Sequence, residues 1–432
     1  MGMNDGQERA THARYWVVVF AVTLAVIQYI DRVCISKAMP SIQGELGFTN
    51  VQVGYVFGAF TLAYALFEIP GGWLGDRFGP RKVLMRVVIW WSFFTAATGW
   101  ATSAVSMVVV RFFFGAGEAG CFPNITKAFT TWLPGNERVR AQSILWLAAR
   151  WGGAVTPLLV VGVFSLVSSW RRAFELFGLV GIVWAVLFYR WFRDNPLDHP
   201  SVGARERALL AGIDSLASRH AKVPWRVFLT SPSAWLLWIQ YACMSYVWYF
   251  YITWFPTYLD ATHGKSLTPV ALAILAGLPL FGGGFGSLIS GFSTAPLARR
   301  LGGMGRARKV LAASGFVSAS VFFLASMYVR DPILMPVLIA LGGLAIDFVM
   351  PCAWGACMDV GGRFAGTFSG SMNMMGNLGG FIAPIATGYI LDRTGNWNLA
   401  FLISSAVYLG GAVCWLLLDP VTPLDREPVP AT

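Results

Sequence analysis

Long apolar runs separated by short polar or charged segments dominate the hydrophobic pattern of this chain. Breaking the sequence at charges, prolines and glycines gives twelve such runs, six in each half. A transmembrane helix needs about 20 mostly apolar residues, and each run is of that order. The pattern therefore predicts an all-α membrane protein with spans at 15–38, 51–75, 82–104, 105–130, 139–168, 172–192, 233–259, 270–298, 309–329, 332–358, 364–390 and 397–418.

The longest polar stretch divides the spans into two sets. We predict a tail over 1–14, a six-helix bundle over 15–193, a linker over 194–232, a second six-helix bundle over 233–418 and a tail over 419–432. Within the linker, four apolar residues suit one face of a short helix on the membrane surface. These residues are Leu209, Leu210, Ile213 and Leu216, and a plain linker is the alternative.

The two halves also repeat each other. Two motifs recur at the same offset of 227 positions, which favours duplication of a six-span unit. Such internal repeats are typical of secondary transporters, whose substrate sites lie between the repeats near the bilayer midplane. Shared helix-packing residues are the alternative explanation. The repeated motifs are Gly152-Gly153-x-x-x-Pro157 with Gly379-Gly380-x-x-x-Pro384, and Trp170-x-x-Ala-Phe174 with Trp397-x-x-Ala-Phe401.

Composition supports the membrane assignment. Apolar residues make up 56% of the 432 positions and charged residues 12%, whereas soluble domains carry about 25% charged residues. This balance excludes a soluble enzyme, a disordered protein and a nucleic-acid module, so the expected surroundings are a lipid bilayer. The first apolar run continues into further spans, so we interpret 15–38 as a span and not as a cleaved signal peptide.

The net charge of +11 has a topological explanation. With both termini on one side, 22 Lys and Arg residues fall in segments on that side and six on the other. Cytoplasmic loops carry an excess of basic residues, so we expect both termini in the cytoplasm. The absence of a long external domain suits a bacterial inner membrane.

Cysteine and histidine positions argue against metal sites and catalysis. The six cysteines lie in apolar segments without the spacing of disulfides or zinc ligands, and all four histidines lie outside the spans. We therefore expect no cofactor and no metal, and any proton chemistry inside the membrane must use carboxylates. A polytopic enzyme would need a nucleophile or metal constellation, and the spans contain none.

A loop motif after the second span identifies a family. The sequence Gly72-Trp-Leu-Gly-Asp76-Arg77-Phe-Gly79-Pro-Arg81-Lys82 resembles the loop signature of the major facilitator superfamily. Asp76 lies where it can receive a helix N-terminus or an Arg from a neighbouring span. The corresponding stretch Gly291-Phe-Ser-Thr-Ala295-Pro296-Leu-Ala-Arg299-Arg300 lacks the acid, so we expect a weaker charge latch there.

Further motifs narrow the resemblance. Tyr29-Ile-Asp31-Arg32, Arg111-x-x-x-Gly-x-Gly-Glu118-x-x-x-Phe-Pro123 and Thr253-Trp-Phe-Pro-Thr-Tyr258-Leu are similar to the anion:cation symporter family. Its members include bacterial sugar-acid transporters and animal sialic-acid and vesicular glutamate carriers. The resemblance implies transport of organic anions, often with protons.

Charged residues inside the spans are functional candidates, because each costs about 2.5–3.5 kcal/mol at the bilayer centre. Two of them, Glu68 and Lys127, lie near the cytoplasmic ends of their spans. We expect these two to reach water and to be structural. The other six are Asp31, Arg32, Arg111, Glu118, Arg150 and Asp347.

Tyr29 and Arg32 lie three positions apart and share a helix face. The guanidinium of Arg32 is a planar, permanent cation that suits a carboxylate. The resemblance implies that Arg32 binds the substrate carboxylate and that Asp31 is a protonation site. A structural ion pair between Asp31 and a neighbouring helix is the alternative.

Arg111 and Glu118 share a face but lie about 10.5 Å apart along the axis, too far for a direct salt bridge. Each therefore pairs with something else. Burial raises the pKa of a carboxyl and a nearby cation lowers it, so Glu118 can alternate between protonated and Arg-paired states. The resemblance implies that Glu118 couples protons, and a fixed pair is the alternative. We count Arg111 among the candidate substrate-binding residues, with a neighbouring helix as its other possible partner.

Arg150 is particular to this chain, because the matching neighbourhood in the family carries small or amide residues. A further cation there suggests a second anionic group on the substrate, or a partner for Glu118 or Asp31. Asp347 could also pair with one of the arginines across the bundles. Tyr64, Tyr249 and Asn373, with Ser369 one turn earlier, complete the expected cavity as hydrogen-bonding groups.

These observations predict a monomeric, proton-coupled symporter that moves a small organic anion inward. Arg32 and Arg150 would bind the anion, and Asp31 and Glu118 would carry protons. A proton-independent anion exchanger or facilitator is the main alternative, and a lipid carrier resembling the spinster group is another.

Overall fold

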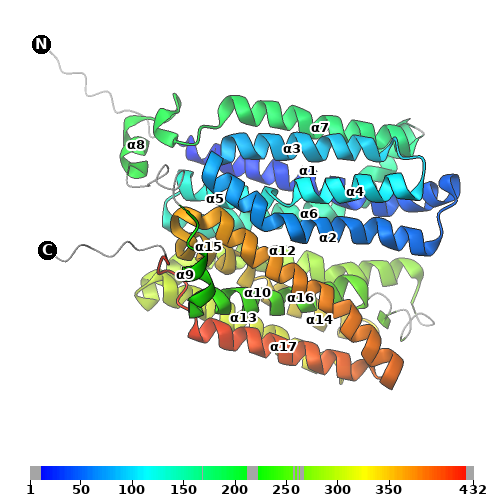
Figure 1. Cartoon of the computed structure of the whole chain (residues 1–432). Coiled ribbons are helices and arrows are strands. Elements are labelled where there is room, and N and C mark those ends of the chain that lie inside the picture. Colours follow the sequence, from blue (N-terminus) through cyan, green and yellow to red (C-terminus); the bar gives the residue numbers. More distant parts are fainter. Residues whose placement is uncertain are drawn as a thin grey trace, which may run out of the picture.

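Long helices aligned along one axis make up the computed structural model, which describes residues 11–167, 169–211, 222–255, 258–259, 262 and 267–424. Both ends of the described chain lie at the same end of the molecule, beside α8 (Ala204–Leu210) and α9 (Trp225–Thr230) (Figure 1). We call this the linker end and the opposite one the loop end. Residues 1–10 and 425–432 of the expected tails and 212–221 of the expected linker lie outside the described residues.

The first half builds its six spans from seven helices of the described chain. The first three spans end in tight turns, and Gly79 joins the second to the third at a φ of 83°, which favours glycine. The helices are α1 (Arg14–Leu46), α2 (Asn50–Phe78), α3 (Pro80–Thr98), α4 (Ala104–Glu118), α5 (Cys121–Trp132), α6 (Gly135–Val167) and α7 (Trp170–Trp191).

The second half repeats this order. Its seventh span is described as α10 up to Thr253, and Pro256 and Thr257 of the predicted span lie outside the described residues. The helices are α10 (Pro232–Thr253), α12 (Pro269–Leu301), α13 (Met304–Ser326), α14 (Leu334–Ile346), α15 (Val349–Gly361), α16 (Ala365–Thr394) and α17 (Trp397–Leu417). Short 3₁₀ turns, η1 (Pro196–Asp198) and η2 (Gly362–Phe364), complete the described helices.

Two of the predicted spans contain a break in the helix. The run 105–130 divides into α4 and α5 at Ala119–Gly120, and 332–358 divides into α14 and α15 at Asp347–Phe348. Gly71 of α2 packs directly on Gly120, so close that an added Cβ would come within 2.6 Å of the Gly120 Cα. The two interruptions lie at matching places in the halves, as a repeat of one unit would give.

The repeated glycines perform the same packing in both halves. Gly153 of α6 lies against the ring of Tyr29 in α1, and Gly380 of α16 lies against the ring of Tyr249 in α10. Glycine at each site lets an aromatic ring lie on the helix backbone. The contacts place α6 on α1 and α16 on α10, so the fifth span packs on the first in both bundles.

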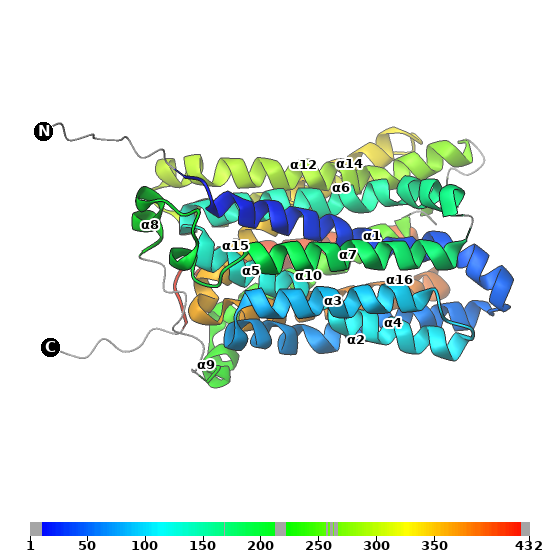
Figure 2. The ribbon, with the colours of Figure 1, turned by 90° about the horizontal axis from the view of Figure 1, so that it is seen from above.

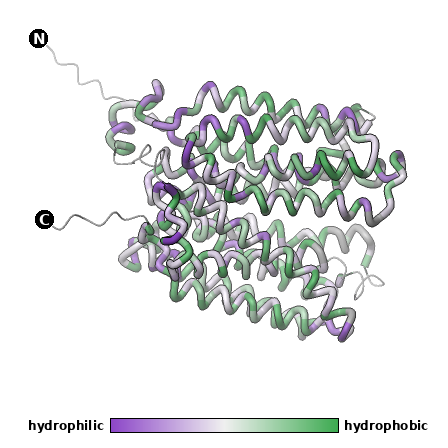
Figure 3. The backbone as a smooth tube through the Cα atoms, viewed as in Figure 1, coloured by the Kyte–Doolittle hydropathy of each residue, from purple (hydrophilic) through white to green (hydrophobic). Residues whose placement is uncertain are grey.

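The two bundles meet along two helix crossings. Helix α2 packs on α16, and α6 packs on α12, which lie side by side in Figures 1 and 2. Hydrophobic residues dominate the middles of the helices, whereas hydrophilic residues gather toward their ends (Figure 3). Seven helical stretches of the described chain are long and apolar enough to cross a membrane on length and composition alone.

The expected surface helix of the linker is confirmed only in part. Helix α8 contains Leu209 and Leu210, but Leu210 is buried and Leu209 is 49% exposed. Ile213 and Leu216 lie outside the described residues. Glu206 of α8 joins this helix to the start of α1 through hydrogen bonds with the backbone N–H groups of Ala13 and Arg14.

Candidate functional site

A central cavity of about 70 Å³ lies between the two bundles. Residues of α1, α2, α5 and α6 line it from the first half, and residues of α10, α15 and α16 line it from the second. Six residues predicted for the substrate site are among them: Tyr29, Arg32, Tyr64, Arg150, Tyr249 and Asn373. The predicted site residue Arg111 does not line this cavity in the part of the chain that the structure describes.

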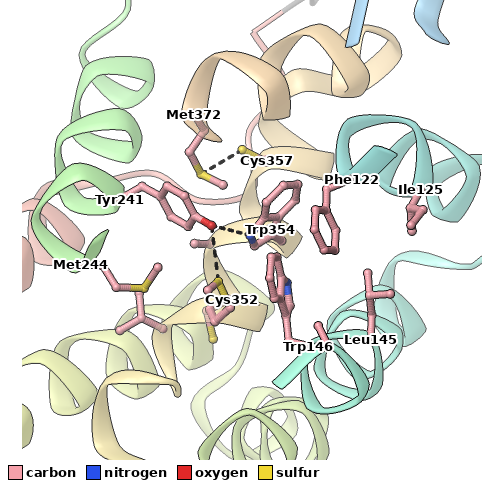
Figure 4. Packing of buried hydrophobic residues seen from close by; sticks show 14 of the residues in the cluster. Phe122, Ile125, Leu145, Trp146, Tyr241, Met244, Cys352, Trp354, Cys357 and Met372 are labelled. Carbon is pink, nitrogen blue, oxygen red and sulfur yellow. Dashed lines mark hydrogen bonds between the residues drawn. The ribbon is translucent and has the colours of Figure 1, made fainter. Parts of the chain in front are cut away.

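Aromatic side chains from both bundles pack against one another (Figure 4), and three of them, Phe122, Trp146 and Tyr241, line the cavity. Phe122 of α5 stacks on Trp146 of α6 with ring centres 4.6 Å apart, and Trp146 lies 5.5 Å from Trp354 of α15. The indole N–H of Trp354 donates to the hydroxyl of Tyr241 at 3.1 Å. These four residues, which we call the aromatic floor, connect the two bundles beside the cavity.

Arg32 connects the cavity to a buried carboxylate. Its Nη2 lies 2.6 Å from Oε1 of Glu118 and its Nε donates to the same oxygen at 2.9 Å. Gln28, one turn earlier on α1, donates to that oxygen at 2.8 Å. The Glu118 side chain is fully buried and the Arg32 side chain is 26% exposed. Arg32 is therefore the half of the pair that a ligand in the cavity can reach.

Asp31 and Arg111 lie behind this wall of the cavity. The indole N–H of Trp91 donates to Oδ2 of Asp31 at 3.1 Å, and in the part of the chain that the structure describes Oδ1 has no hydrogen-bond partner. Arg111 is also buried, with its guanidinium carbon 4.1 Å from the ring centre of Phe114, and its Nε and Nη1 lack hydrogen-bond partners within the described ranges. The prediction that Glu118 does not form a salt bridge with Arg111 is confirmed, because Glu118 pairs with Arg32 instead.

Glu68 corrects a prediction. We expected it to reach water near the end of its span, but it is fully buried beside the cavity. One carboxylate oxygen accepts from Nδ2 of Asn373, and the other accepts from Nδ2 of Asn377 at 3.2 Å. Tyr249 donates to Oδ1 of Asn377 at 3.2 Å. Glu68 of α2 is thus bonded to α16 across the bundle interface.

Arg150 forms the second charged pair of the cavity wall. Its Nη2 donates to Oδ1 of Asp347 at 3.0 Å, which links α6 to the turn between α14 and α15. Gly283 of α12 makes room for this carboxylate, because an added Cβ would occupy the position of Asp347 Oδ2. Arg150 therefore pairs with Asp347 in this structure, and not with Asp31 or Glu118.

Asp76 fixes the start of α16 at the linker end. Its carboxylate accepts from the backbone N–H groups of Gly366 at 3.1 Å and Thr367 at 2.6 Å, and from the Thr367 hydroxyl at 2.6 Å. Lys127 lies 3.3 Å from the same carboxylate and also donates to the carbonyl oxygen of Arg363. The expected helix N-terminus is found, whereas Lys127, expected to reach water, is buried.

The other residues of the loop motif make separate packing contacts and hydrogen bonds. Gly72 lies against the carbonyl of Gly366, where an added Cβ would clash with the backbone of α16. Arg81 donates from Nη2 to the carbonyl oxygen of Tyr189 at 2.8 Å, which ties α3 to α7. Arg77 is stacked 5.2 Å from the ring centre of Trp73.

The matching contact of the second half uses different chemistry. Gly291 packs on Ser143 of α6, and Ala295 places no carboxylate at the start of that helix. Asp359 instead accepts from Nη1 of Arg138 at 3.1 Å across the interface, and it pairs with Arg308 at 2.7 Å. In the second half, the carboxylate that forms a charged contact between the bundles therefore lies on α15, at Asp359, and not on α12.

Several cavity residues were missed from the sequence. Tyr241, Ser245 and Trp248 of α10 and Asn377 of α16 line the cavity, and so does Met350 of α15. The signal for Asn377 was its position one helical turn after Asn373. Ser369 was expected in the cavity, but its hydroxyl donates to the carbonyl oxygen of Gly366 within α16. Among the described residues, no group of three His, Cys, Asp or Glu side chains is placed to hold a metal.

Comparisons with known proteins agree with this arrangement. The sequence pattern of the Major Facilitator Superfamily matches residues 21–384. A probable sulfoacetate transporter of Cupriavidus necator is 35% identical over 414 residues, which cover 95% of each chain. A probable galactarate/D-glucarate transporter of Escherichia coli is 30% identical over 446 residues, covering 98% of this chain and 97% of the relative.

Solved structures show the same fold. The human organic anion transporter MFSD10 gives a TM-score of 0.71 at 14% identity, over 93% of this chain and 99% of that one. A proton:xylose symporter of the same superfamily gives a TM-score of 0.69 at 12% identity, over 94% of each chain. At these identities the likeness shows the twelve-span architecture alone.

Proposed function

This chain belongs to the Major Facilitator Superfamily and is a multi-pass membrane transporter, and from that premise we propose that it takes up a small organic anion together with protons. Its relatives are named for transport of sulfoacetate, galactarate and D-glucarate. An arginine in a water-excluded cavity is the expected anchor for such an anion. The anion, the proton and the two-bundle movement are three parts of one cycle.

The observation that carries the proposal is the pair between Arg32 and Glu118. Arg32 lines the cavity, yet its guanidinium is bonded to a fully buried carboxylate. A substrate carboxylate must compete with Glu118 for the same N–H donors. A proton on Glu118 removes this competitor and frees Arg32, so proton binding and anion binding support each other.

A second carboxyl suits the energetics of uptake. A negative-inside membrane potential opposes anion entry by about 2.3 kcal/mol per charge for every 100 mV. Entry of at least as many protons as anionic charges removes this penalty. Asp31 is the second proton carrier in this proposal, after Glu118. It is buried, it directly precedes Arg32 in the sequence, and one of its oxygens lacks a hydrogen-bond partner among the described residues.

The closed end of the cavity sets the direction. We propose that the linker end is cytoplasmic, as the excess of basic residues in its loops favours, and that the membrane is the bacterial inner membrane. Asp76 and Asp359 join the bundles at this end, and the aromatic floor joins them beside the cavity. The structure then corresponds to a state closed to the cytoplasm, and uptake proceeds by rocking the bundles until these contacts separate.

A Glu118→Gln variant tests the coupling. We expect the variant to lose accumulation driven by a pH gradient in proteoliposomes, because its side chain no longer binds and releases a proton. It should retain exchange of labelled for unlabelled sulfoacetate, the probe chosen from the relative's name, since that exchange needs no net proton movement. Accumulation equal to that of the unaltered protein would contradict the role of Glu118. Wild-type flux that ignores the pH gradient would favour an anion exchanger.

A further inference from the structure

A second cationic side chain lines the cavity, and binding of a substrate with a single carboxylate to Arg32 does not require it. Arg150 lines the cavity and is 5% exposed. Its Nη2 donates to Asp347 at 3.0 Å, but its Nε has no hydrogen-bond partner among the described residues. A guanidinium offers five N–H groups in a fixed fork, and leaving them unsatisfied in a buried site is costly. Arg150 therefore has unused donor capacity beside the cavity.

Arg32 and Arg150 are both close to one tyrosine, Tyr29. The guanidinium carbon of Arg32 is 5.4 Å from the ring centre of Tyr29. The same ring lies on Gly153, which follows Arg150 by three positions and therefore shares its face of α6. All three side chains line the cavity. The two cations thus face one small cavity.

The counter-charges of the two arginines come from different bundles. Glu118, the partner of Arg32, belongs to the first bundle, whereas Asp347, the partner of Arg150, belongs to the second. Glu118 and Asp347 do not line the cavity in the described part of the chain, but both arginines do. An anionic group that enters the cavity can therefore meet either guanidinium from the side away from its carboxylate.

We infer that the cavity selects short organic dianions, with one anionic group bound by Arg32 and the other by Arg150. This inference rests on the proposed function and adds the charge and length of the substrate. A cavity of about 70 Å³ favours two anionic groups joined by a chain of a few atoms at most. A dicarboxylate or a sulfonate-carboxylate has this form.

Charge at the second group gives the selectivity. A hydrogen bond to a charged group is stronger than one between neutral groups, so a neutral amide in the same place accepts less strongly. A second anionic group also approaches the contact of Arg150 with Asp347, which joins the two bundles. The dianion thereby reaches a contact that moves in the cycle, whereas a monoanion held by Arg32 alone stays within the first bundle.

Binding of paired ligands to the full-length purified protein tests the inference. Succinate and sulfoacetate are the dianions, and succinamate and methylsulfonylacetate are monoanions of similar size. We expect the dianions to bind at least tenfold more tightly by calorimetry. In the double variant Arg150→Gln with Asp347→Asn, which leaves neither buried charge unpaired, we expect this ratio to fall to about one.

The controls separate the possible failures. Arg140→Gln removes an arginine from the same helix that contacts Phe292 and not the cavity, and it should keep the wild-type ratio. A cooperative thermal transition shows that the double variant is folded. Equal binding of monoanions and dianions by the unaltered protein, or an unchanged ratio in the folded double variant, would overturn the inference while the proposed function stands. Binding of no anion at all would overturn both.

Discussion

Two buried carboxylates bind helix N-termini with the same set of groups, one between the two bundles and one between the linker and the first bundle. Asp76 receives two backbone N–H groups at the start of α16, the hydroxyl of Thr367 and the charge of Lys127. Glu206 receives two backbone N–H groups at the start of α1, the hydroxyl of Thr11 and the charge of Arg14.

The difference lies in what each contact joins. Asp76 bonds groups about 290 positions away and connects the second span to the eleventh, so this contact must break whenever the bundles rock open at the linker end. Glu206 connects the linker to the first span, and both remain together through such a movement. The same chemistry therefore controls the transport equilibrium in one place and only stability in the other.

Asp76→Asn gives the largest expected effect. The amide keeps one acceptor oxygen but turns an N–H₂ group toward backbone donors and loses the charge that attracts Lys127. Lost charged hydrogen bonds of this kind cost about 1.5–3 kcal/mol each, which corresponds to a shift of roughly tenfold or more toward the open state. We expect uptake to fall at least tenfold.

Labelling of a cysteine introduced at Met358 measures the state directly, because this residue is 1% exposed at the linker end. Its reactivity should rise in the Asp76→Asn background. Each of the six native cysteines needs replacement first, since several are buried nearby. Unchanged labelling together with lost uptake would show that Asp76 acts on folding and not on the closed state.

A matched pair of glycines gives the next effect. In Gly370→Ala, the new Cβ would lie 2.5 Å from the backbone carbonyl oxygen of Glu68, which the crossing of α2 and α16 fixes. In Gly284→Ala, the new Cβ would meet the tip of Trp151, which is 38% exposed and free to shift. Overpacking against a fixed group costs about 1–3 kcal/mol.

We expect Gly370→Ala to lower uptake several-fold and Gly284→Ala to change it less than twofold. Uptake per amount of inserted protein in the same vesicles is the measurement. Equal losses in both variants would mean that the α6–α12 crossing is as tightly specified as the α2–α16 crossing.

The spans and the latch could be predicted from sequence because their causes are local. Apolar length requires a helix in the bilayer, and an acid at the membrane edge, such as Asp76, needs a compensating group nearby. The interruptions at Ala119–Gly120 and Asp347–Phe348 also have a local cause, which the prediction did not use. Pro123 and Pro351 lie four positions after Ala119 and Asp347, and a proline has no N–H to bond to the carbonyl four residues earlier.

The position of Glu68 shows the limit of one-dimensional reasoning. The position of Glu68 along the second span follows from the sequence. Its access to water depends on α16, because Asn373 of that helix, 305 positions away, bonds to the Glu68 carboxylate. The pairing of Arg150 was similarly open. Charges inside the membrane identify a site, whereas their partners are set by the packing of helices remote in sequence.

Glu68→Gln tests the inner contact of the same crossing. Gln keeps the size of the side chain and can accept from one of the two asparagines, but its amide N–H₂ then faces the other. A net loss of about 1 kcal/mol is typical of one such hydrogen bond. We expect the reactivity of the cysteine at Met358 to rise about fivefold, less than in Asp76→Asn. A rise as large as that of Asp76→Asn would make Glu68 the main latch.

Glu206→Gln gives the smallest effect and tests the other side of the comparison. The pKa of Glu206 is lowered, since its hydrogen bonds to Arg14, Thr11 and Ala13 outweigh the cost of burial. A lowered pKa contributes stability above the unfolded value of about 4.3, and this stability is lost as the pH falls through the folded pKa. Replacing a helix cap costs about 1 kcal/mol, or roughly 2 °C in melting temperature for a chain of this size.

The deficit of Glu206→Gln in melting temperature should therefore be complete at pH 7 and shrink below about pH 4.3. Uptake and cysteine labelling at Met358 should stay within twofold of the unaltered protein, because the contact does not join the bundles. A loss of uptake comparable to that of Asp76→Asn would mean that the linker moves with the transport cycle. The contrast would then lie in the strength of the two contacts rather than in what they connect.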